Sequence, residues 1–406
     1  MDAPIAAAAR ALAAGDPLGA LNWIALREDA SALALRGIAM AQLGDLVHAK
    51  TLVKRAARAF GQKHPVARAR CVVAEAEIAL VSRDLGWPTQ ALNAARDTLD
   101  EHGDRVNAGY ARYLEVRRLL LIGRLDEAER ALAAIDASPF HPAAKAAYEL
   151  VVAGIAIRRL RTRAARAAIA RAERAARRAN IPSLTAEVES ASRVLEMPAA
   201  RSVARGEETF LLLEQVEALH ASKALVVDAC RFVVRDSKRV VSLARRPVLF
   251  ALARALAEAW PADVPRDVLL ARAFGAKFSD DSHRARLRVE IGRLRRVLRH
   301  MAGLSATKRG FAMAPSGARE VVVLAQPIEA EHASVLAMLT DGEAWSSSAL
   351  ALALGASQRT VQRALDSLAA SGKVQWVGRG RARRWTAPPV PGFTTTLLLP
   401  APLSID

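Results

Sequence analysis

The stretch DDSHRARLRVEIGRLRRVLRHM, residues 280–301, sets the interpretation of the second half of the chain. Its apolar residues recur with the 4-3-4 spacing of one face of an α-helix, which predicts a stripe that is buried in a core. That stripe comprises Leu287, Ile291, Leu294 and Leu298. Seven arginines but only one acid, Glu290, lie between residues 284 and 299. We therefore expect a helix that packs through one face and presents a strongly cationic face to solvent.

The arginines of this helix form the first set of candidate binding residues. A rotation of roughly 100° per residue places some of them opposite the apolar stripe and the others toward its flanks. The set consists of Arg284, Arg286, Arg288, Arg293 and Arg296. A helix about 10 Å wide fits the major groove of DNA, where Arg binds phosphates or makes bidentate contacts to guanine. A merely solvated helix would usually alternate charges of both signs.

The sequence before this helix predicts a small sheet and two further helices. Segments rich in Val at 224–228, 231–235 and 239–243 are broken by polar turns, as short strands are. Pro247 suits the first turn of a helix through FALARALAEAW, and Pro265 suits the start of a helix through DVLLARAF.

A basic turn follows the Arg-rich helix in the segment ATKRGFAMAP, residues 306–315. Apolar residues on both sides of the turn predict a β-hairpin, with Lys308 and Arg309 at its tip and Gly310 permitting the turn. Lys308 and Arg309 therefore join the candidate binding residues.

The order of strands, three helices and a hairpin from about residue 224 to 315 resembles the OmpR/PhoB-type effector domain, a winged helix. The resemblance rests on the leading strands, on IGRLRRVL at 291–298 and on TKRGF at 307–311. It implies that the Arg-rich helix enters the major groove of duplex DNA and that the hairpin, or wing, contacts the minor groove. Two features depart from that family: no receiver domain precedes the segment, and Phe311 directly follows Gly310. Phosphorylation control is therefore not implied.

A second set of helices followed by a hairpin is predicted over residues 328–386. A turn at Gly355 separates two helical segments, and Ser357 can cap the second by accepting a backbone N–H. The core stripe of that second helix is Val361, Leu365 and Leu368. Its other polar side chains can reach base edges and phosphates. These candidate binding residues are Arg359, Thr360, Gln362 and Arg363.

The segments KVQWV and RRWTA predict the two strands of a second basic hairpin, in which Gly378 and Gly380 relieve strain in the turn. Its basic residues, also candidates for DNA contact, are Arg379, Arg381, Arg383 and Arg384. With LALGASQRTVQRAL at 352–365, the region resembles the helix-turn-helix and wing of MarR-like bacterial repressors over about 60 residues. That resemblance implies DNA contact, and a winged helix recruited for dimerisation is the alternative.

Residues 1 to about 200 show almost no strand signal, and Ala, Leu and Val recur in them at helical spacing. The segments 35–56 and 116–135 share one design: a helix, a turn with Gly, and an Ala early in the next helix. The matching alanines are Ala49, Ala91, Ala128 and Ala165, at steps of 42, 37 and 37 residues. The pattern resembles tetratricopeptide-type repeats over roughly residues 30–180, although the large aromatic positions of that family are mostly missing. An irregular helical bundle is the alternative.

Composition favours a mainly helical protein of several domains. Hydrophobic residues make up 52% of the 406 residues but aromatic residues only 4%, which favours small-residue helix packing over β-sandwich cores. We expect a mainly α fold with small β-hairpins, in three domains. They are a tetratricopeptide-like array at 1–205, an OmpR/PhoB-like winged helix at 206–326, and a second winged helix with a C-terminal tail at 327–406.

Several classes of function and location are not expected. The sequence contains no phosphate-binding loop, no dinucleotide-binding glycine fingerprint, no H-E-x-x-H and no C-x-x-C, so we expect no enzyme activity, catalytic residue, cofactor or metal site. Cys71 and Cys230 lie in apolar stretches and are expected to be core thiols. The apolar run at 150–157 is too short for a membrane span and no signal peptide is predicted, so we expect a cytoplasmic protein without a membrane partner.

The net charge of +18 predicts a polyanionic partner, although Arg-rich solvated helix faces would produce the same excess. The favoured interpretation is a bacterial-type transcription regulator that binds double-stranded DNA. Its helical array would bind a protein, peptide or small-ligand signal, or mediate self-association as a homodimer. Two alternatives stay open: a low-specificity architectural or defence-associated DNA-binding protein, and a repeat scaffold for protein interactions with degenerate winged helices.

Overall fold

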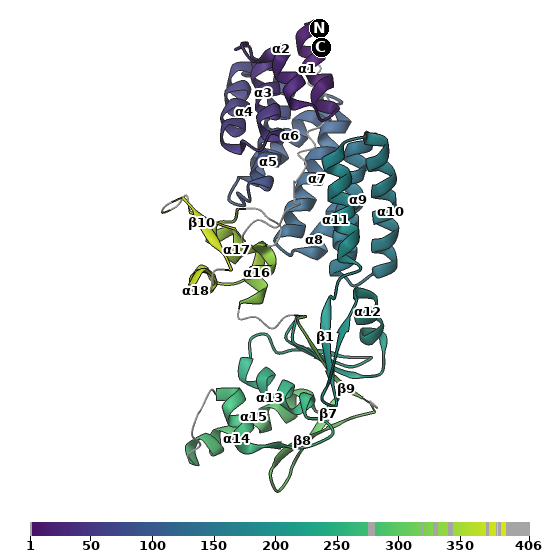
Figure 1. Cartoon of the computed structure of the whole chain (residues 1–406), viewed down its shortest axis with the longest axis vertical. Helices are drawn as coiled ribbons and strands as arrows, with labels where there is room; N and C mark the ends of the chain where they lie inside the picture. Colours follow the sequence, from purple (N-terminus) through teal and green to yellow (C-terminus); the bar gives the residue numbers. More distant parts are fainter. Residues whose placement is uncertain are drawn as a thin grey trace. The chain divides into compact units, whose positions relative to one another are not determined.

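The computed structural model is mainly helical, with 62% of the residues that it describes in helices, and it carries a few small sheets (Figure 1). It describes residues 2–274, 281–317, 320–327, 332–339, 344–370, 373–378, 380 and 383–386. The described residues form two compact units. Unit 1 takes its residues from 1–159, 163–193 and 331–406, and unit 2 takes them from 160–162 and 194–330. The mainly α fold class with small sheets is confirmed.

Eleven helices from residue 3 to 194 form a helical array in which neighbours in the sequence pack against one another (Figure 1). They are α1 (Ala3–Ala13), α2 (Pro17–Ile24), α3 (Ala30–Gln42), α4 (Leu46–Phe60), α5 (Pro65–Val81), α6 (Thr89–Glu101), α7 (Arg105–Leu121), α8 (Leu125–Ala133), α9 (Pro142–Arg158), α10 (Thr162–Ala179) and α11 (Pro182–Val194). Asp45 caps α4 by accepting the backbone N–H of His48 at 3.1 Å. Gly44 and Gly123 take positive φ angles of 88° and 77° in the turns between helices.

The small residues early in the second helix of each hairpin are buried, with one change of register. Ala49, Ala128 and Ala165 are each the fourth residue of their helix and have no exposed surface. The expectation for Ala91 is wrong, because α6 begins at Thr89, directly after Pro88. Its fourth residue is therefore Leu92, which is buried, whereas Ala91 is half-buried. The close helix contact at this position thus accepts a larger side chain in α6.

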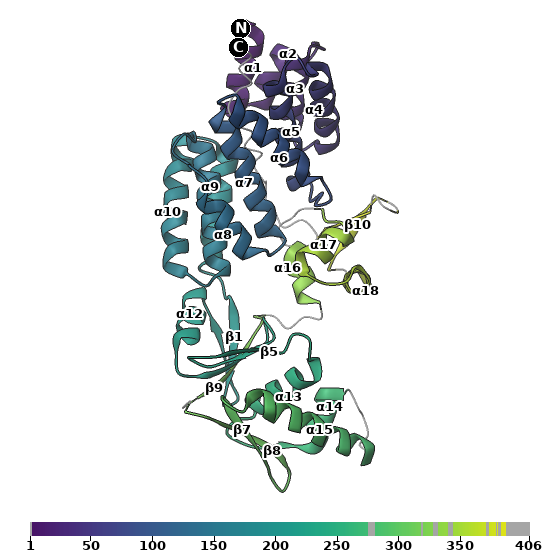
Figure 2. The same cartoon turned by 180° about the vertical axis from the view of Figure 1, so that it is seen from behind.

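Five further elements complete unit 1 and are called the C-terminal segment. They are α16 (Ala333–Leu339), α17 (Ser347–Leu354), α18 (Gln358–Ala370), β10 (Gln375–Val377) and β11 (Arg384–Thr386). Leu339, Trp345 and Leu350 belong to the same buried cluster as residues of α5, α7 and α9. The C-terminal segment accordingly lies beside the array in both views (Figure 1, Figure 2). The hairpin of β10 and β11 pairs Trp376 with Trp385, as the two segments predict.

Unit 2 is built on a six-stranded sheet in the order β2-β1-β9-β3-β4-β5. Its strands are β1 (Ala200–Ala204), β2 (Glu207–Leu211), β3 (Leu225–Asp228), β4 (Val233–Arg235), β5 (Val240–Ser242) and β9 (Val321–Ala325). The three strands expected between 224 and 243 are confirmed as β3, β4 and β5. The hairpin β1–β2 was not expected, and it spans the expected domain boundary at residue 205. All five residues of β9 are buried between antiparallel β1 and parallel β3.

The other half of unit 2 contains the Arg-rich helix. Its elements are α12 (Leu213–Ala221), α13 (Pro247–Glu258), β6 (Val264–Pro265), α14 (Arg266–Phe274), α15 (Asp281–Leu298), β7 (Ala302–Ala306) and β8 (Gly310–Pro315). β6, β8 and β7 form a three-stranded sheet. Both Pro-led helices and the hairpin β7–β8 are confirmed.

The two cysteines differ in environment. Cys71 is buried in α5, as expected. Cys230 is exposed in the turn that follows β3, so the expectation of a core thiol there is wrong. The turn folds around Asp228, which accepts the backbone N–H groups of Cys230 and Arg231 and so holds this backbone at the surface.

Candidate nucleic-acid interface

The rotation of α15 is fixed by its apolar stripe. Leu287, Ile291, Leu294 and Leu298 are at most 1% exposed and share a core with α13. This confirms the predicted buried stripe. The five candidate arginines of the helix, Arg284, Arg286, Arg288, Arg293 and Arg296, are all exposed. Together with Val289, which is 54% exposed, they give α15 a face that is cationic with one apolar side chain.

Arg286 and Arg293 are held by neighbours. The Arg286 guanidinium lies 4.6 Å from the centre of the Phe274 ring, a stacked cation–π contact. Arg293 pairs with Glu290 at 2.7 Å, although 60% of its side chain stays exposed. Among the described residues, Arg288 and Arg296 have no hydrogen bond or ion pair. An anion can therefore reach Arg288 and Arg296 without displacing a contact that either side chain already makes.

The hairpin β7–β8 presents Lys308 and Arg309 at an exposed tip. The turn closes through a hydrogen bond of 3.0 Å from the Thr307 N–H to the Gly310 carbonyl. The Thr307 hydroxyl accepts the Gly310 N–H at 2.8 Å and donates to Asp263 at 2.5 Å. The tip is therefore tied to the loop before β6, and its two cations are held on a short, closed turn.

Gly310 serves a different purpose from the one expected. It does not have a positive φ angle, so the expectation that it permits the turn is wrong. A Cβ added at Gly310 would lie 1.8 Å from the carbonyl oxygen of Val264 in β6. Glycine is needed here because the backbones of β6 and β8 approach closely where Pro265 pairs with Gly310.

Three basic residues that the sequence did not single out brace this region. Arg266 donates to the carbonyls of Lys308 and Thr307 at 3.0 and 3.1 Å. Arg295, on α15, donates to the Leu304 carbonyl in β7 at 2.8 Å. Arg239 donates to the His300 carbonyl at the end of the helix at 2.8 Å. These hydrogen bonds hold the Arg-rich helix and the hairpin β7–β8 together. No local sequence signal distinguishes Arg239, Arg266 and Arg295 from surface arginines.

A second cationic helix lies in the C-terminal segment. Val361, Leu365 and Leu368 of α18 are buried, as predicted, and Ser357 caps the helix by accepting the Thr360 N–H at 3.1 Å. Gly355 ends α17 in the left-handed conformation expected of the turn. The candidates Arg359, Thr360 and Arg363 are exposed.

Not every polar side chain of α18 is equally available. Gln362 is half-buried and donates to the Asp366 carboxylate at 2.9 Å. The Thr360 and Ser357 hydroxyls lie 2.8 Å apart in a hydrogen bond. Gln362 would have to leave Asp366 before its amide could donate to a base.

The second hairpin carries its arginines against tryptophan rings. The Arg383 guanidinium lies 5.4 Å from the Trp376 ring centre and 5.5 Å from that of Trp385. Arg384 is half-buried and donates to the Arg383 carbonyl at 3.2 Å. Gly378 and Gly380 both take positive φ angles, which confirms their role in the turn. Arg379, Arg381 and the apolar stretch at 394–403 lie outside the described residues.

The candidate residues thus fall into two groups. Arg284, Arg286, Arg288, Arg293, Arg296, Lys308 and Arg309 belong to unit 2, and Arg359, Thr360, Gln362, Arg363, Arg383 and Arg384 belong to unit 1.

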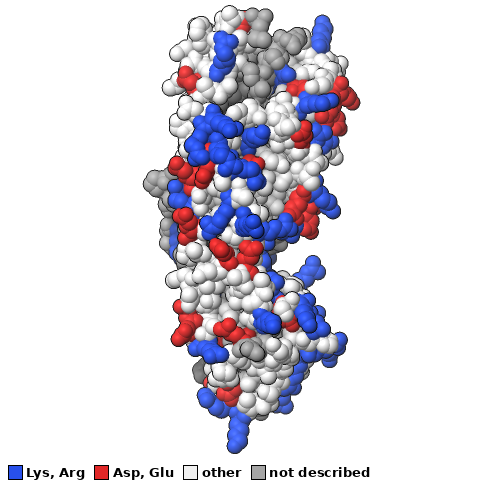
Figure 3. Space-filling view, turned by 90° about the vertical axis from the view of Figure 1, so that its right-hand side faces the viewer, with Lys and Arg blue, Asp and Glu red and all other residues white. Residues whose placement is uncertain are grey.

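The array contributes a third basic face on α10. Its exposed arginines are Arg163, Arg166, Arg171, Arg174, Arg177 and Arg178. Figure 3 looks onto the side of the array where α10 lies and shows Lys and Arg side chains gathered there. Arg171 is already paired with Glu149 at 2.8 Å.

The described ranges contain neither a metal-binding cluster nor a membrane-spanning helix. Nowhere in them do three or more His, Cys, Asp or Glu residues group so that they could hold a metal ion. No helix in those ranges combines the length and apolar character needed to cross a membrane. In comparisons with protein-family profiles, curated proteins and solved structures, the chain gave no match.

Proposed function

We propose that the chain is a DNA-binding transcription regulator whose unit 2 binds duplex DNA as a winged helix of the OmpR/PhoB type. The C-terminal segment would be a second, MarR-like winged helix, and the array a tetratricopeptide-like sensor or partner-binding region. The strongest support is the geometry of α15, where a fully buried apolar stripe occupies one face and five exposed arginines lie opposite it or at its flanks.

The dimensions and charge of α15 suit the major groove. Eighteen residues at about 1.5 Å each give a helix of roughly 27 Å. Between residues 284 and 299 the arginines are accompanied by one acid, Glu290, which is paired with Arg293. Arg288 and Arg296 can contact phosphates or guanine at no cost in lost ion pairs, while Arg286 is pre-positioned by the Phe274 ring.

The wing supports the same function. Lys308 and Arg309 sit on a turn held by Thr307 and by the side chain of Arg266. A turn that is held by side-chain hydrogen bonds loses little conformational entropy when its cations bind phosphates. The free-energy cost of this contact is therefore lower than that of a contact made by a flexible loop.

The C-terminal segment gives weaker support for a second contact with DNA. Arg359 and Arg363 are exposed on α18, but Gln362 is engaged with Asp366. Phosphate contact through the two arginines is therefore favoured over base readout through Gln362. Dimerisation through this segment is the alternative.

The test is a selection of bound duplexes from a random-sequence pool, followed by affinity measurements in a salt series. Replacing Arg288 and Arg296 together by Ala should reduce the log–log salt slope by about 1.8, because each lost phosphate contact removes about 0.9. Between 50 and 200 mM salt, the wild type should then lose roughly 12 times more affinity than the variant.

A matched control removes the same charge elsewhere. Arg10 and Arg58 are exposed in the array, so the double variant Arg10→Ala, Arg58→Ala should keep the wild-type slope. A discrete enriched motif supports the regulator, and uniform enrichment supports a low-specificity architectural protein. If no duplex is retained, or if the slope is unchanged in a folded Arg288, Arg296 variant, the proposal for α15 is wrong.

A further inference from the structure

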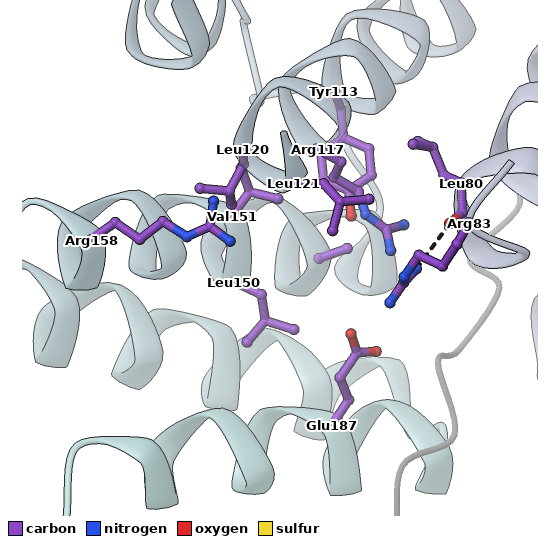
Figure 4. Close-up of a pocket in the computed structure, with 11 residues that line it drawn as sticks. Leu80, Arg83, Tyr113, Arg117, Leu120, Leu121, Leu150, Val151, Arg158 and Glu187 are labelled. Carbon is purple, nitrogen blue, oxygen red and sulfur yellow. Dashed lines mark hydrogen bonds between the residues drawn. The ribbon is translucent and has the colours of Figure 1, made fainter. Parts of the chain in front are cut away.

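A pocket of about 220 Å³ lies between the first helices of successive hairpins in the array. Its walls come from α5, α7, α9 and α11 (Figure 4). Apolar side chains such as Leu80, Leu121 and Leu150 line part of it. Its volume is below the roughly 300–1,000 Å³ of pockets for drug-sized molecules, so any occupant is small. We call it the array pocket.

The polar lining of the array pocket is dominated by guanidinium groups. Among the described residues that line it are Arg83, Arg117 and Arg158 and one carboxylate, that of Glu187 (Figure 4). Figure 4 shows the carboxylate of Glu187 directed toward the side on which Arg83 and Arg117 lie. The arginines come from residues 34 and 41 positions apart in the sequence, and only the stacking of the hairpins brings them together.

A second carboxylate lies behind the lining. Glu77 has no exposed surface, accepts the Tyr110 hydroxyl at 2.6 Å and lies 3.9 Å from Arg117. Burial raises the pKa of Tyr110 and of Tyr113, so both phenols are neutral at physiological pH. Among the described residues that line the pocket, guanidinium groups therefore outnumber carboxylates by three to one.

We propose that the array pocket binds a small organic monoanion with an apolar body, such as a monocarboxylate, and that Arg83 transmits its binding to the C-terminal segment. A guanidinium group holds a carboxylate through two parallel hydrogen bonds. The leucines of the walls would contact the apolar body of the same molecule. A neutral molecule of the same shape would lack this charge-assisted contact with the guanidinium groups.

Arg83 connects this pocket to the C-terminal segment. The Arg83 guanidinium lies 5.2 Å from the centre of the Trp345 ring and donates to the Leu80 carbonyl at 2.9 Å. Trp345 is fully buried and exchanges two backbone hydrogen bonds of 2.7 Å with Trp385 in β11. A carboxylate that draws the guanidinium toward the pocket weakens its contact with Trp345 and so acts on the residue that anchors the second hairpin.

The backbone of Arg83 sets the direction in which its side chain leaves the end of α5. Its φ angle is 53°, in the left-handed region that residues other than glycine rarely adopt. This conformation ends α5 and directs the side chain to the place where the array pocket and Trp345 meet. Local strain of this kind persists when the surrounding structure holds it.

The test uses the full chain and 3-phenylpropionate as probe, with 3-phenylpropanamide as its neutral match in shape. Saturation-transfer NMR should show saturable binding of the acid, with the amide at least about tenfold weaker, since one charge-assisted contact is lost. Arg83→Gln should weaken the acid by about tenfold, and Leu150→Trp should abolish binding by filling the pocket while keeping its charges. Arg58→Gln, an exposed array arginine outside the pocket, should bind as the wild type does.

Tryptophan emission tests the connection. Saturating acid should change the emission of the wild type, and the change should be lost in Trp345→Phe. Equal binding of acid and amide, undiminished binding in folded Leu150→Trp, or the absence of saturable binding would overturn the site. Retained binding without an emission change would overturn the role of Arg83. Because these measurements contain no DNA, their failure is distinct from a failure of the proposed DNA-binding function.

Discussion

The orientation of α15 makes a pair of substitutions informative. Leu294 and Arg296 are two residues apart on one helix, yet Leu294 has no exposed surface and Arg296 is exposed. Replacing Leu294 by Ala leaves a cavity in the core shared with α13 and should cost about 2–5 kcal/mol in the free energy of unfolding. Replacing Arg296 by Ala should change that free energy by less than about 0.5 kcal/mol.

The expected shift in melting temperature follows from the size of unit 2. Residues 160–162 and 194–330 amount to about 140 residues, for which the entropy of unfolding is roughly 0.3 kcal/mol/K. A loss of about 3.5 kcal/mol then lowers the melting temperature of this unit by about 12 °C.

Differential scanning calorimetry of the full chain provides the assay, with the transition of unit 1 as an internal reference. Leu294→Ala should lower only the transition of unit 2. A shift below about 3 °C for Leu294→Ala, or an equal shift for Arg296→Ala, would refute the assignment of the two faces of α15.

Three further outcomes are expected. Gly310→Ala should destabilise unit 2 by about 1–3 kcal/mol, because the added Cβ would collide with the Val264 carbonyl. An unchanged free energy of unfolding in chemical denaturation would contradict this close approach. Burial raises the pKa of Cys71 to about 12, so a maleimide probe at pH 8 should label Cys71 only after unfolding. Labelled Cys71 peptides from the folded protein, detected by mass spectrometry after digestion, would contradict this. A fragment of residues 194–330 should fold, whereas one beginning at residue 206 should be less stable because it lacks β1, the antiparallel neighbour of β9; equal melting temperatures by circular dichroism would contradict this.

The sequence predicted best where a strict period coincides with burial. The stripes of α15 and α18 follow helical spacing without interruption, so their buried faces were predictable residue by residue. The hairpins β7–β8 and β10–β11 were predictable because turn residues separate short apolar runs. In these places local propensity and tertiary packing favour the same structure.

Prediction failed where the structure depends on distant partners. β1 and β2 carry mostly half-buried or exposed residues, so no alternation marks them, and they exist because β9 completes the sheet. Gly310 resembles an ordinary turn glycine until β6 is placed against it. The array pocket joins Arg83, Arg117 and Arg158 from three different helical hairpins, and no local pattern distinguishes these arginines from the many others.

The position of β9 also has a consequence for biosynthesis. The strand that lies between β1 and β3 in the sheet is the last strand of that sheet to leave the ribosome. About 120 residues separate β1 from β9, which at roughly 5–20 residues per second amounts to about 6–24 s of translation. From the time each is synthesised until β9 follows, β1 and β3 each have an unsatisfied edge that can pair with another nascent chain. The speed of translation through residues 205–320, or a chaperone that shields those edges, would therefore determine how much of the protein reaches its native fold.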